Sequence, residues 1–151
     1  MSKKSRDKGK RGERAVIDWL QPVLNKLTKQ IGVKPVLLQR NTVQSDRGGT
    51  DIIGLRWMGA EVKNCEKQNV SSLNDWWAQC VEQAEEWSEP GRPLTPVLFY
   101  TKAFAPIRVR LPGAIWCPHA QGVHVATMVD VSAEDFEAYF LARCRAELTP
   151  A

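Results

Sequence analysis

The apolar positions between residues 13 and 27 recur every three or four residues, which is the spacing of one face of an α-helix. Pro22 interrupts the pattern, and because proline has no amide hydrogen to donate, we expect the helix to kink or restart there. Glu13 precedes Val16 by three positions and Leu20 by seven, so its carboxylate falls on the buried side of this helix. The apolar positions are Val16, Trp19, Leu20, Val23, Leu24 and Leu27.

Other segments of the sequence predict a second helix in the middle of the chain, a terminal helix and several strands. The continuous apolar run from Val97 to Tyr100 predicts a buried central strand. Ser132 opens the terminal helix as its N-cap, with Asp135 at the spacing of a capping box. Weaker patterns predict strands over residues 36–39, 108–111, 114–117 and 124–129. The central helix covers residues 73–87, and its apolar face contains Leu73, Trp77, Cys80, Val81, Ala84 and Trp87.

Two short apolar runs bounded by glycines predict a β-hairpin between residues 49 and 63. The first run opens with Asp51, and the second starts at Glu61, Val62 and Lys63. Side chains two apart on a strand share a face, so Glu61 and Lys63 point the same way while Val62 points into the core. The hairpin then brings Asp51 beside Glu61, which gives two converging carboxylates with an ammonium next to them.

This combination of residues is typical of a divalent-metal site that hydrolyses a phosphodiester. Mg²⁺ prefers carboxylate oxygens, keeps several waters and takes further ligands from substrate phosphate. The metal lowers the pKa of a bound water, and a lysine can orient that water. The alternative is a solvated acid-x-lysine pair on an exposed strand. Asp51 argues against it, because this residue stands between Thr50 and two isoleucines, an unusual place for a solvating charge.

The pattern resembles the signature of the PD-(D/E)xK nuclease superfamily, which Asp51, Glu61 and Lys63 match. Thr50 replaces the proline that often precedes the aspartate. Residues 8–14, followed by an amphipathic helix, resemble the opening of archaeal-type Holliday-junction resolvases and related phage nucleases. The resemblance covers about residues 8–84, in short pieces.

The resemblance implies an α/β fold with a single restriction-endonuclease-like core, in which a mixed central β-sheet is flanked by helices. It also implies that Lys63 positions the attacking water. Mg²⁺, for which Mn²⁺ substitutes, would be held by Glu13, Asp51, Glu61 and the carbonyl of Val62. For Glu13 a first-turn glutamate favoured by the helix dipole is an equal alternative.

The same resemblance implies residues that position the substrate. Arg40 before the hairpin and Ser45 in the loop match recurring family positions. Several of these families use a glutamine on the helix after the hairpin to position the substrate or the water. Gln79 matches this catalytic residue by order, with Gln83 nearly as good. The alternative is two amides on a half-exposed helix face. Trp76 is a candidate for stacking on an unpaired base, although tryptophans in a small domain also serve the core or an interface.

Charge is concentrated at the N-terminus. The formal net charge of the 151 residues is +4, but residues 1–14 contain seven basic and two acidic side chains and carry +5. We interpret residues 1–10 as a basic, flexible arm and residues 11–151 as one nuclease-like domain; a solubilising tail is the alternative for residues 1–6. The candidate DNA contacts are Lys8, Lys10, Arg11, Arg14, Arg40, Ser45, Arg47, Trp76 and Gln83.

The cysteines give no sign of a disulfide framework or of a zinc site. Cys65, Cys80, Cys117 and Cys144 form no CxxC pair, and Cys117 with His119 and His124 lacks a fourth ligand at suitable spacing. No run of about 18 apolar residues suggests a membrane span. We expect a reduced protein in the cytoplasm of a bacterial or phage-infected cell, with no membrane partner.

Taken with the resemblance, these features predict a Mg²⁺-dependent DNA endonuclease selective for DNA structure. A homodimeric Holliday-junction resolvase is the first choice, because two opposed cuts need two sites related by two-fold symmetry. One alternative is a nuclease that acts on flaps, ends or single strands. Another is a non-catalytic DNA-binding module that kept the fold. Residues 104–128 are open to three interpretations, a dimer surface, a substrate flap or scaffold.

Overall fold

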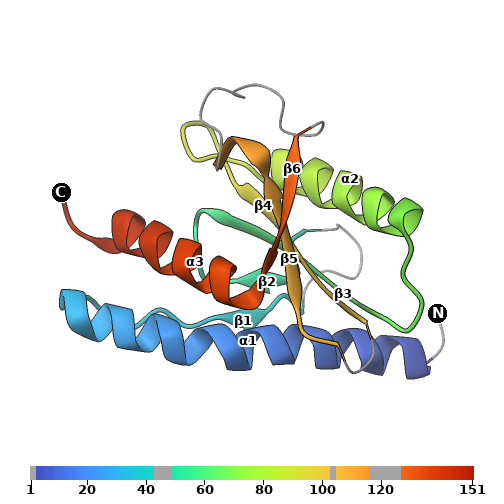
Figure 1. Ribbon diagram of the computed structural model, residues 1–151. Coiled ribbons are helices and arrows are strands. Elements are labelled where there is room, and N and C mark those ends of the chain that lie inside the picture. The colour runs from blue at the N-terminus through green and yellow to red at the C-terminus, as the bar shows by residue number, and fades with distance from the viewer. Residues whose placement is uncertain (1–2, 43–48, 103–104, 116–126) are drawn as a thin grey trace.

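The computed structural model describes residues 3–42, 49–102, 105–115 and 127–151. Within these residues a mixed six-stranded sheet is flanked by three α-helices, so the predicted single-domain α/β class is confirmed (Figure 1). The elements in chain order are α1 (Lys3–Ile31), β1 (Gln39–Arg40), β2 (Ile52–Ile53), β3 (Met58–Cys65), α2 (Val70–Glu86), β4 (Thr95–Lys102), β5 (Arg108–Pro112), the 3-10 helix η1 (Gly113–Ile115), β6 (Met128–Ser132) and α3 (Ala133–Leu148).

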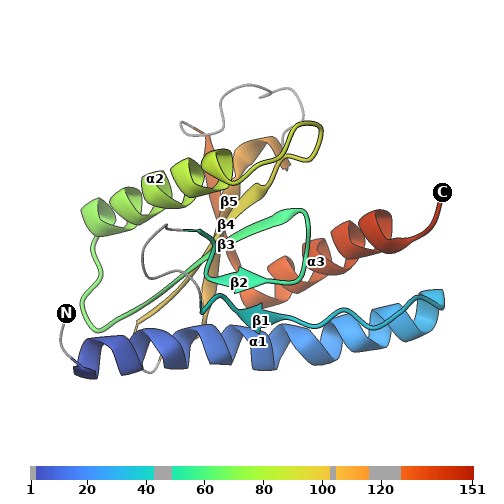
Figure 2. The ribbon, with the colours of Figure 1, turned by 180° about the vertical axis from the view of Figure 1, so that it is seen from behind.

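The strands lie across the sheet in chain order, from β1 at one edge to β6 at the other. Among the described strands, β3 and β4 alone run parallel, and α2 is the crossover between them. Helices α1 and α3 cover one face of the sheet and α2 covers the other (Figures 1 and 2). Successive residues of β3 therefore face different helices, which decides the direction of every candidate site residue on that strand.

Helix α1 is longer and more regular than the sequence predicts. It runs unbroken for 29 residues through Pro22, so the predicted restart there is wrong. Pro22 is exposed while Leu20, Leu24 and Leu27 are fully buried, and this packing offsets the one hydrogen bond that proline removes. Residues 3–10, interpreted as a flexible arm, form the first turns of the same helix.

The segment before the hairpin is extended but mostly outside the sheet. A strand was predicted over residues 36–39, whereas β1 begins only at Gln39. The side-chain amide of Gln21 explains the difference, because its Nε2 donates to the Val36 carbonyl (2.9 Å) and its Oε1 accepts from the Leu38 amide (2.7 Å). A side chain of α1 thus satisfies backbone groups that a neighbouring strand would otherwise take.

Helix α2 has the predicted buried face but ends one residue early. Asn69 is its N-cap, and the Asn69 side chain accepts from the Ser72 amide (2.8 Å) in a capping box with Ser72. The apolar face buries Leu73, Trp77, Cys80, Val81 and Ala84 as expected. Trp87, predicted as part of this face, is instead the C-cap and remains 45% exposed.

The second half of the chain matches the sequence prediction in most elements. Strand β4 has Val97, Leu98 and Phe99 fully buried, and β5 covers the strand predicted at 108–111. The Ser132 hydroxyl caps α3 by accepting from the Asp135 amide (3.1 Å). The strand predicted at 114–117 is wrong in its described part, where residues 113–115 form η1. Of the strand predicted at 124–129, only residues 128–129 belong to β6, and residues 116–126 lie outside the described ranges.

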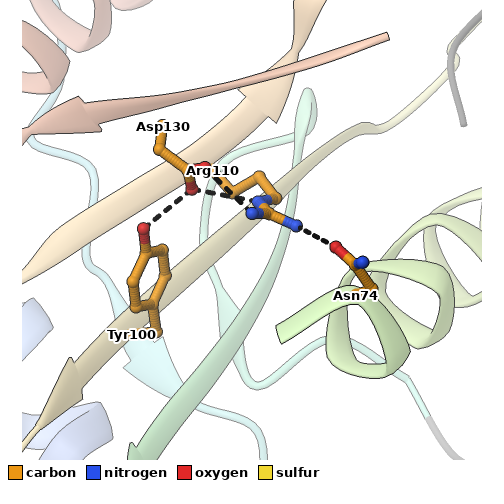
Figure 3. A network of polar contacts seen from close by, with 4 residues as sticks. All are labelled: Asn74, Tyr100, Arg110 and Asp130. Atoms are coloured by element: carbon orange, nitrogen blue, oxygen red, sulfur yellow. Dashed lines mark hydrogen bonds and ion pairs between the residues drawn. The ribbon is translucent and has the colours of Figure 1, made fainter. Parts of the chain in front are cut away.

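A polar network locks β4, β5, β6 and α2 together on the α2 side of the sheet (Figure 3). Arg110 is 5% exposed and donates through two nitrogens to the Asp130 carboxylate, at 2.9 Å each, and through a third to Asn74 (3.0 Å). The Tyr100 hydroxyl donates to the same carboxylate (2.7 Å). Burial alone would raise the pKa of Asp130, but the bonds from Arg110 and Tyr100 outweigh burial and lower it.

No helix in the described ranges is long and apolar enough to cross a membrane.

Candidate active site

The predicted hairpin is present, and Asp51 forms hydrogen bonds with the β3 residues before and after Glu61. Strands β2 and β3 are antiparallel, with Ile52 opposite Ala60. The Asp51 amide donates to the Ala60 carbonyl (2.7 Å), and the Asp51 carboxylate accepts from the Val62 amide (2.7 Å). Because these two bonds bracket position 61 on β3, the Asp51 carboxylate is held next to Glu61, as the sequence predicts.

Gly54 makes this hairpin possible. Its φ is +129°, in the region that L side chains rarely adopt, and a Cβ there would lie 2.3 Å from the Leu37 carbonyl oxygen. The backbone of the 33–38 segment therefore passes directly over Gly54. Any side chain at this position would push the hairpin, and Asp51 with it, away from α1 and β1.

Glu61 and Lys63 point together toward α2, on the side opposite α1. Their side chains form an ion pair with Oε1 and Nζ 2.8 Å apart, and Glu61 is only 4% exposed. Burial, followed by the charge of Asp51, raises the pKa of Glu61 from 4.5 to about 7, although Lys63 acts in the other direction. The surroundings of Glu61 therefore disfavour the ionised form of its carboxyl group.

Two glutamines of α2 complete a closed ring of hydrogen bonds around this pair. Lys63 Nζ donates to Gln79 Oε1 (3.4 Å). With the Gln83 amide oriented so that both its atoms find partners, its nitrogen donates to Glu61 Oε2 (2.9 Å) and its oxygen accepts from Gln79 Nε2 (3.3 Å). The Gln83 nitrogen also lies 3.1 Å from the carbonyl of Gly49, two residues before Asp51.

Both glutamines were predicted near the site, one as a catalytic residue and one as a DNA contact. The structure brings both to the ion pair, and it shows Gln83, rather than Gln79, contacting the glutamate. The four-residue spacing of Gln79 and Gln83 was a signal that the two amides share a helix face. The contact between Gln83 and Gly49 had no signal in the sequence, because it depends on how Gly49 lies against α2 in the folded chain.

Glu13 reaches the same region from the other face of the sheet but has a different partner. A Cβ at Gly12 would lie 3.1 Å from the Asn64 Cβ, so the neighbouring glycine lets α1 cross β3 at close range. The Glu13 carboxylate accepts a hydrogen bond from Arg40 Nε in a largely buried ion pair. Burial raises the pKa of Glu13, the Arg40 bond opposes this, and the charge of Asp51 raises it further.

The predicted gathering of three carboxylates is therefore not seen. In the ranges that the structure describes, no three His, Cys, Asp or Glu residues lie close enough together to hold a metal ion. Glu13 and Arg40, predicted separately as a metal ligand and a DNA contact, neutralise each other here. Asp51 and Glu61 remain as a pair beside Lys63, and Mg²⁺ in proteins commonly uses one or two carboxylates.

The other predicted DNA contacts fall into four groups. Ser45 and Arg47 lie outside the described residues. Trp76 is half-buried and packs against the apolar cluster under α2, so its ring is only partly available for stacking. Lys8 is paired with Glu66 (3.1 Å). A basic hollow of about 780 Å³ along the first turns of α1 is lined by Lys3, Lys4, Asp7, Lys10, Arg11 and Arg14.

The backbone at Val62 supplies a further oxygen. The Val62 amide points toward Asp51, and the amide and carbonyl of one strand residue face the same edge, so the Val62 carbonyl also faces this edge of β3. Strand β2 begins at Ile52, opposite Ala60, so its pairing with β3 does not extend to Val62. The set that fits a hard cation is therefore Asp51, Glu61 and the Val62 carbonyl.

Comparison of the chain with protein-family models, curated protein sequences and solved structures finds no match.

Proposed function

We propose that this chain is a metal-dependent DNA endonuclease that hydrolyses phosphodiester bonds in branched DNA. The observation that carries the proposal is the pair of buried carboxylates, Asp51 and Glu61, held next to Lys63 where β2 begins. The charge of Asp51 disfavours the ionised form of Glu61, and a bound cation would offset this repulsion. Such a pair is more readily explained by a function than by stability.

Asp51, Glu61 and the Val62 carbonyl would hold Mg²⁺, or Mn²⁺ in its place. When bound, the ion supplies an activated water and offsets negative charge on the scissile phosphate. The pKa of Glu61 near 7 supports this assignment, because a cation stabilises the ionised form that burial and Asp51 disfavour. Glu13 is paired with Arg40 and stays a predicted ligand, outside this set.

The side chains around the carboxylates would orient the attack. Lys63 donates to Glu61 and to Gln79, which leaves one ammonium hydrogen to hold the attacking water. Gln83 keeps the second oxygen of Glu61 fixed. Water adds to phosphorus in line with the leaving oxygen, the bond to that oxygen breaks, and the products are a 5′-phosphate and a 3′-hydroxyl.

The proposal is tested by cleavage of labelled four-way junction, flap, linear duplex and single-stranded DNA, with Mg²⁺ or EDTA. Asp51→Asn, Glu61→Gln and Lys63→Ala should each reduce cleavage at least about 100-fold, because each removes a group that acts in the transition state. DNA binding should persist in all three variants, since the main source of affinity is contact with phosphates elsewhere.

The matched controls are Glu82→Gln and Lys26→Ala, which remove the same charges from exposed positions on α2 and α1. Both should keep the cleavage rate of the unaltered protein. Full Mg²⁺-dependent cleavage by Asp51→Asn would show that the activity comes from elsewhere. DNA binding without cleavage in either Mg²⁺ or Mn²⁺ would favour the non-catalytic DNA-binding module.

The products also identify the kind of branched DNA. Paired symmetric cuts in a four-way junction need two sites related by a two-fold axis, so a junction resolvase should have the mass of a homodimer in solution. A monomeric mass together with cuts in flaps or single strands would favour the flap and single-strand nuclease.

A further inference from the structure

Trp87 is an exposed aromatic residue in a segment whose backbone is fixed by hydrogen bonds. It caps α2 at its C-terminus, where its amide donates to the Gln83 carbonyl (3.0 Å), and its side chain is 45% exposed. A tryptophan exposed to this degree leaves much of a large aromatic ring in contact with water, which is costly unless a partner covers it.

The loop after Trp87 is fixed by its own hydrogen bonds. The Arg92 amide donates to the Glu89 carbonyl (2.9 Å) across Pro90 and Gly91, and Gly91 has φ +74°, as a type II turn requires. The Ser88 hydroxyl donates to the Ala84 carbonyl (2.6 Å) and accepts from the Leu94 amide (2.9 Å), which closes the loop. The backbone at Trp87 and Arg92 is thus fixed by hydrogen bonds within the chain.

Two arginines stand beside the indole. A cavity of about 290 Å³ is lined by Trp87, Leu94, Glu89 and Arg92, and by Arg56 from the turn between β2 and β3. The Thr95 amide donates to the Trp57 carbonyl (2.6 Å), which joins that turn to the start of β4. The lining has two positive charges, on Arg56 and Arg92, and one negative charge, on Glu89. The cavity therefore carries net positive charge and suits an anionic ligand.

Gly49 lies between Trp87, which lines this cavity, and the candidate active site. A Cβ at Gly49 would lie 3.7 Å from the Trp87 ring, and the Gly49 carbonyl accepts from Gln83, which also binds Glu61. A ligand on Trp87 would therefore lie one residue away from the contacts that hold the glutamate. That is the position expected of a subsite for a nucleotide next to the scissile phosphate.

We infer that Trp87, Arg56 and Arg92 form a subsite for an unpaired DNA strand, in which a base stacks on Trp87 while the arginines contact the adjacent phosphates. An aromatic ring flanked by cations is the combination that binds single strands without reading their sequence. A base inside a duplex has both faces covered by its neighbours and cannot stack on the indole, so the subsite selects unpaired nucleotides. The inference rests on the proposed function and makes it more specific, toward DNA with a flap, gap or single-stranded end.

The test is a set of dissociation constants measured in EDTA, so that no strand is cut. Fluorescence anisotropy compares linear duplex, flap and single-stranded DNA for Trp87→Ala, Trp87→Phe and the double variant Arg56→Gln/Arg92→Gln. Trp87→Ala should weaken flap and single-strand binding about tenfold or more and duplex binding less than about twofold. Trp87→Phe should recover most of the loss, because phenylalanine still stacks. The arginine variant should also weaken binding and reduce its salt dependence.

The matched control for the arginines is Arg145→Gln, which removes a charge from an exposed position on α3 and should leave all dissociation constants unchanged. Equal loss for duplex and flap in Trp87→Ala, or no loss for either, would overturn the subsite even if the protein cuts DNA. Absence of DNA binding by the unaltered protein would overturn the proposed function, and the subsite with it. Thermal unfolding of each variant shows whether a loss reflects misfolding, in which case Trp87→Phe decides.

Discussion

Burial and the adjacent Asp51 give Glu61 a pKa of about 7 in the folded protein, against 4.5 for an ordinary glutamate. Between these two values the folded state binds more protons at this residue than the unfolded state does. The contribution of Glu61 to stability is therefore largest below pH 4.5 and is lost as pH rises to about 7. A shift of this size corresponds to a loss on the order of 3 kcal/mol.

We expect Glu61→Gln to raise the free energy of unfolding by about 1–3 kcal/mol near pH 8 in metal-free buffer, because the substitution removes a disfavoured charge. The gain should shrink toward zero at pH 4.5. Urea unfolding in EDTA at several pH values measures it, with Glu82→Gln as the exposed control. Adding Mg²⁺ should stabilise the unaltered protein and not Glu61→Gln. A variant that is less stable than the unaltered protein at pH 8 would contradict the pKa assignment.

The residues of the candidate site differ in how far the sequence could predict them. Glu61 and Lys63 were predictable as a pair because strand alternation is a local rule that needs no knowledge of the fold. Asp51 followed from the hairpin. The pairing of Glu13 with Arg40 did not, because two residues 27 positions apart meet only after α1 has packed against the sheet. Their meeting depends on the close approach at Gly12, which no periodic pattern reveals.

Among the elements, the β2–β3 hairpin depends most on a single position. Gly54→Ala should lower the free energy of unfolding by about 2 kcal/mol or more, because the new Cβ meets the Leu37 carbonyl and φ is unfavourable for alanine. Gly9→Ala is the matched control, since a Cβ at Gly9 meets nothing within 4 Å on α1. That substitution should stabilise by up to about 1 kcal/mol.

Urea unfolding of both glycine variants gives the two values. If Gly54→Ala proved as stable as Gly9→Ala, the carbonyl of Leu37 would have to move without cost, and the hairpin geometry described above would be wrong. A loss of DNA cleavage in Gly54→Ala that exceeds the unfolded fraction would show in addition that the hairpin positions Asp51.

The elements that the sequence predicted well are those whose pattern is unambiguous. Residues 73–87 and 97–100 each repeat one pattern, and packing on the sheet agrees with it. Short extended segments were harder, because a run such as 36–39 has the composition of a strand whichever group takes its hydrogen bonds. Here the side-chain amide of Gln21 forms those hydrogen bonds, and its position next to residues 36–38 is known only from the folded chain. The exposure of Trp87 was missed for a similar reason, since it depends on the residue at which α2 ends.

At the scale of the whole molecule, positive charge lies along the first turns of α1. Lys10 and Arg14 are both exposed and line the basic hollow. If this hollow follows the DNA backbone, Lys10→Gln/Arg14→Gln should reduce the slope of log affinity against log salt by about 2 for duplex DNA. The matched control is Lys26→Gln/Lys29→Gln, which removes two exposed charges from the other end of the same helix. Equal slopes for the two double variants would show that the hollow does not contact phosphate.

The ring formed by Glu61, Lys63, Gln79 and Gln83 has a direction. An ionised carboxylate only accepts hydrogen bonds and an ammonium only donates them, so the two amides between them must both be oriented in one sense. A proton on Glu61 would remove that requirement, because a carboxylic acid can donate to the Gln83 oxygen. The orientation of the Gln79 and Gln83 amides on α2 thus depends on the charge state of Glu61 on β3. If a proton on Glu61 reversed the Gln83 amide, the Gly49 carbonyl would lose the nitrogen that donates to it.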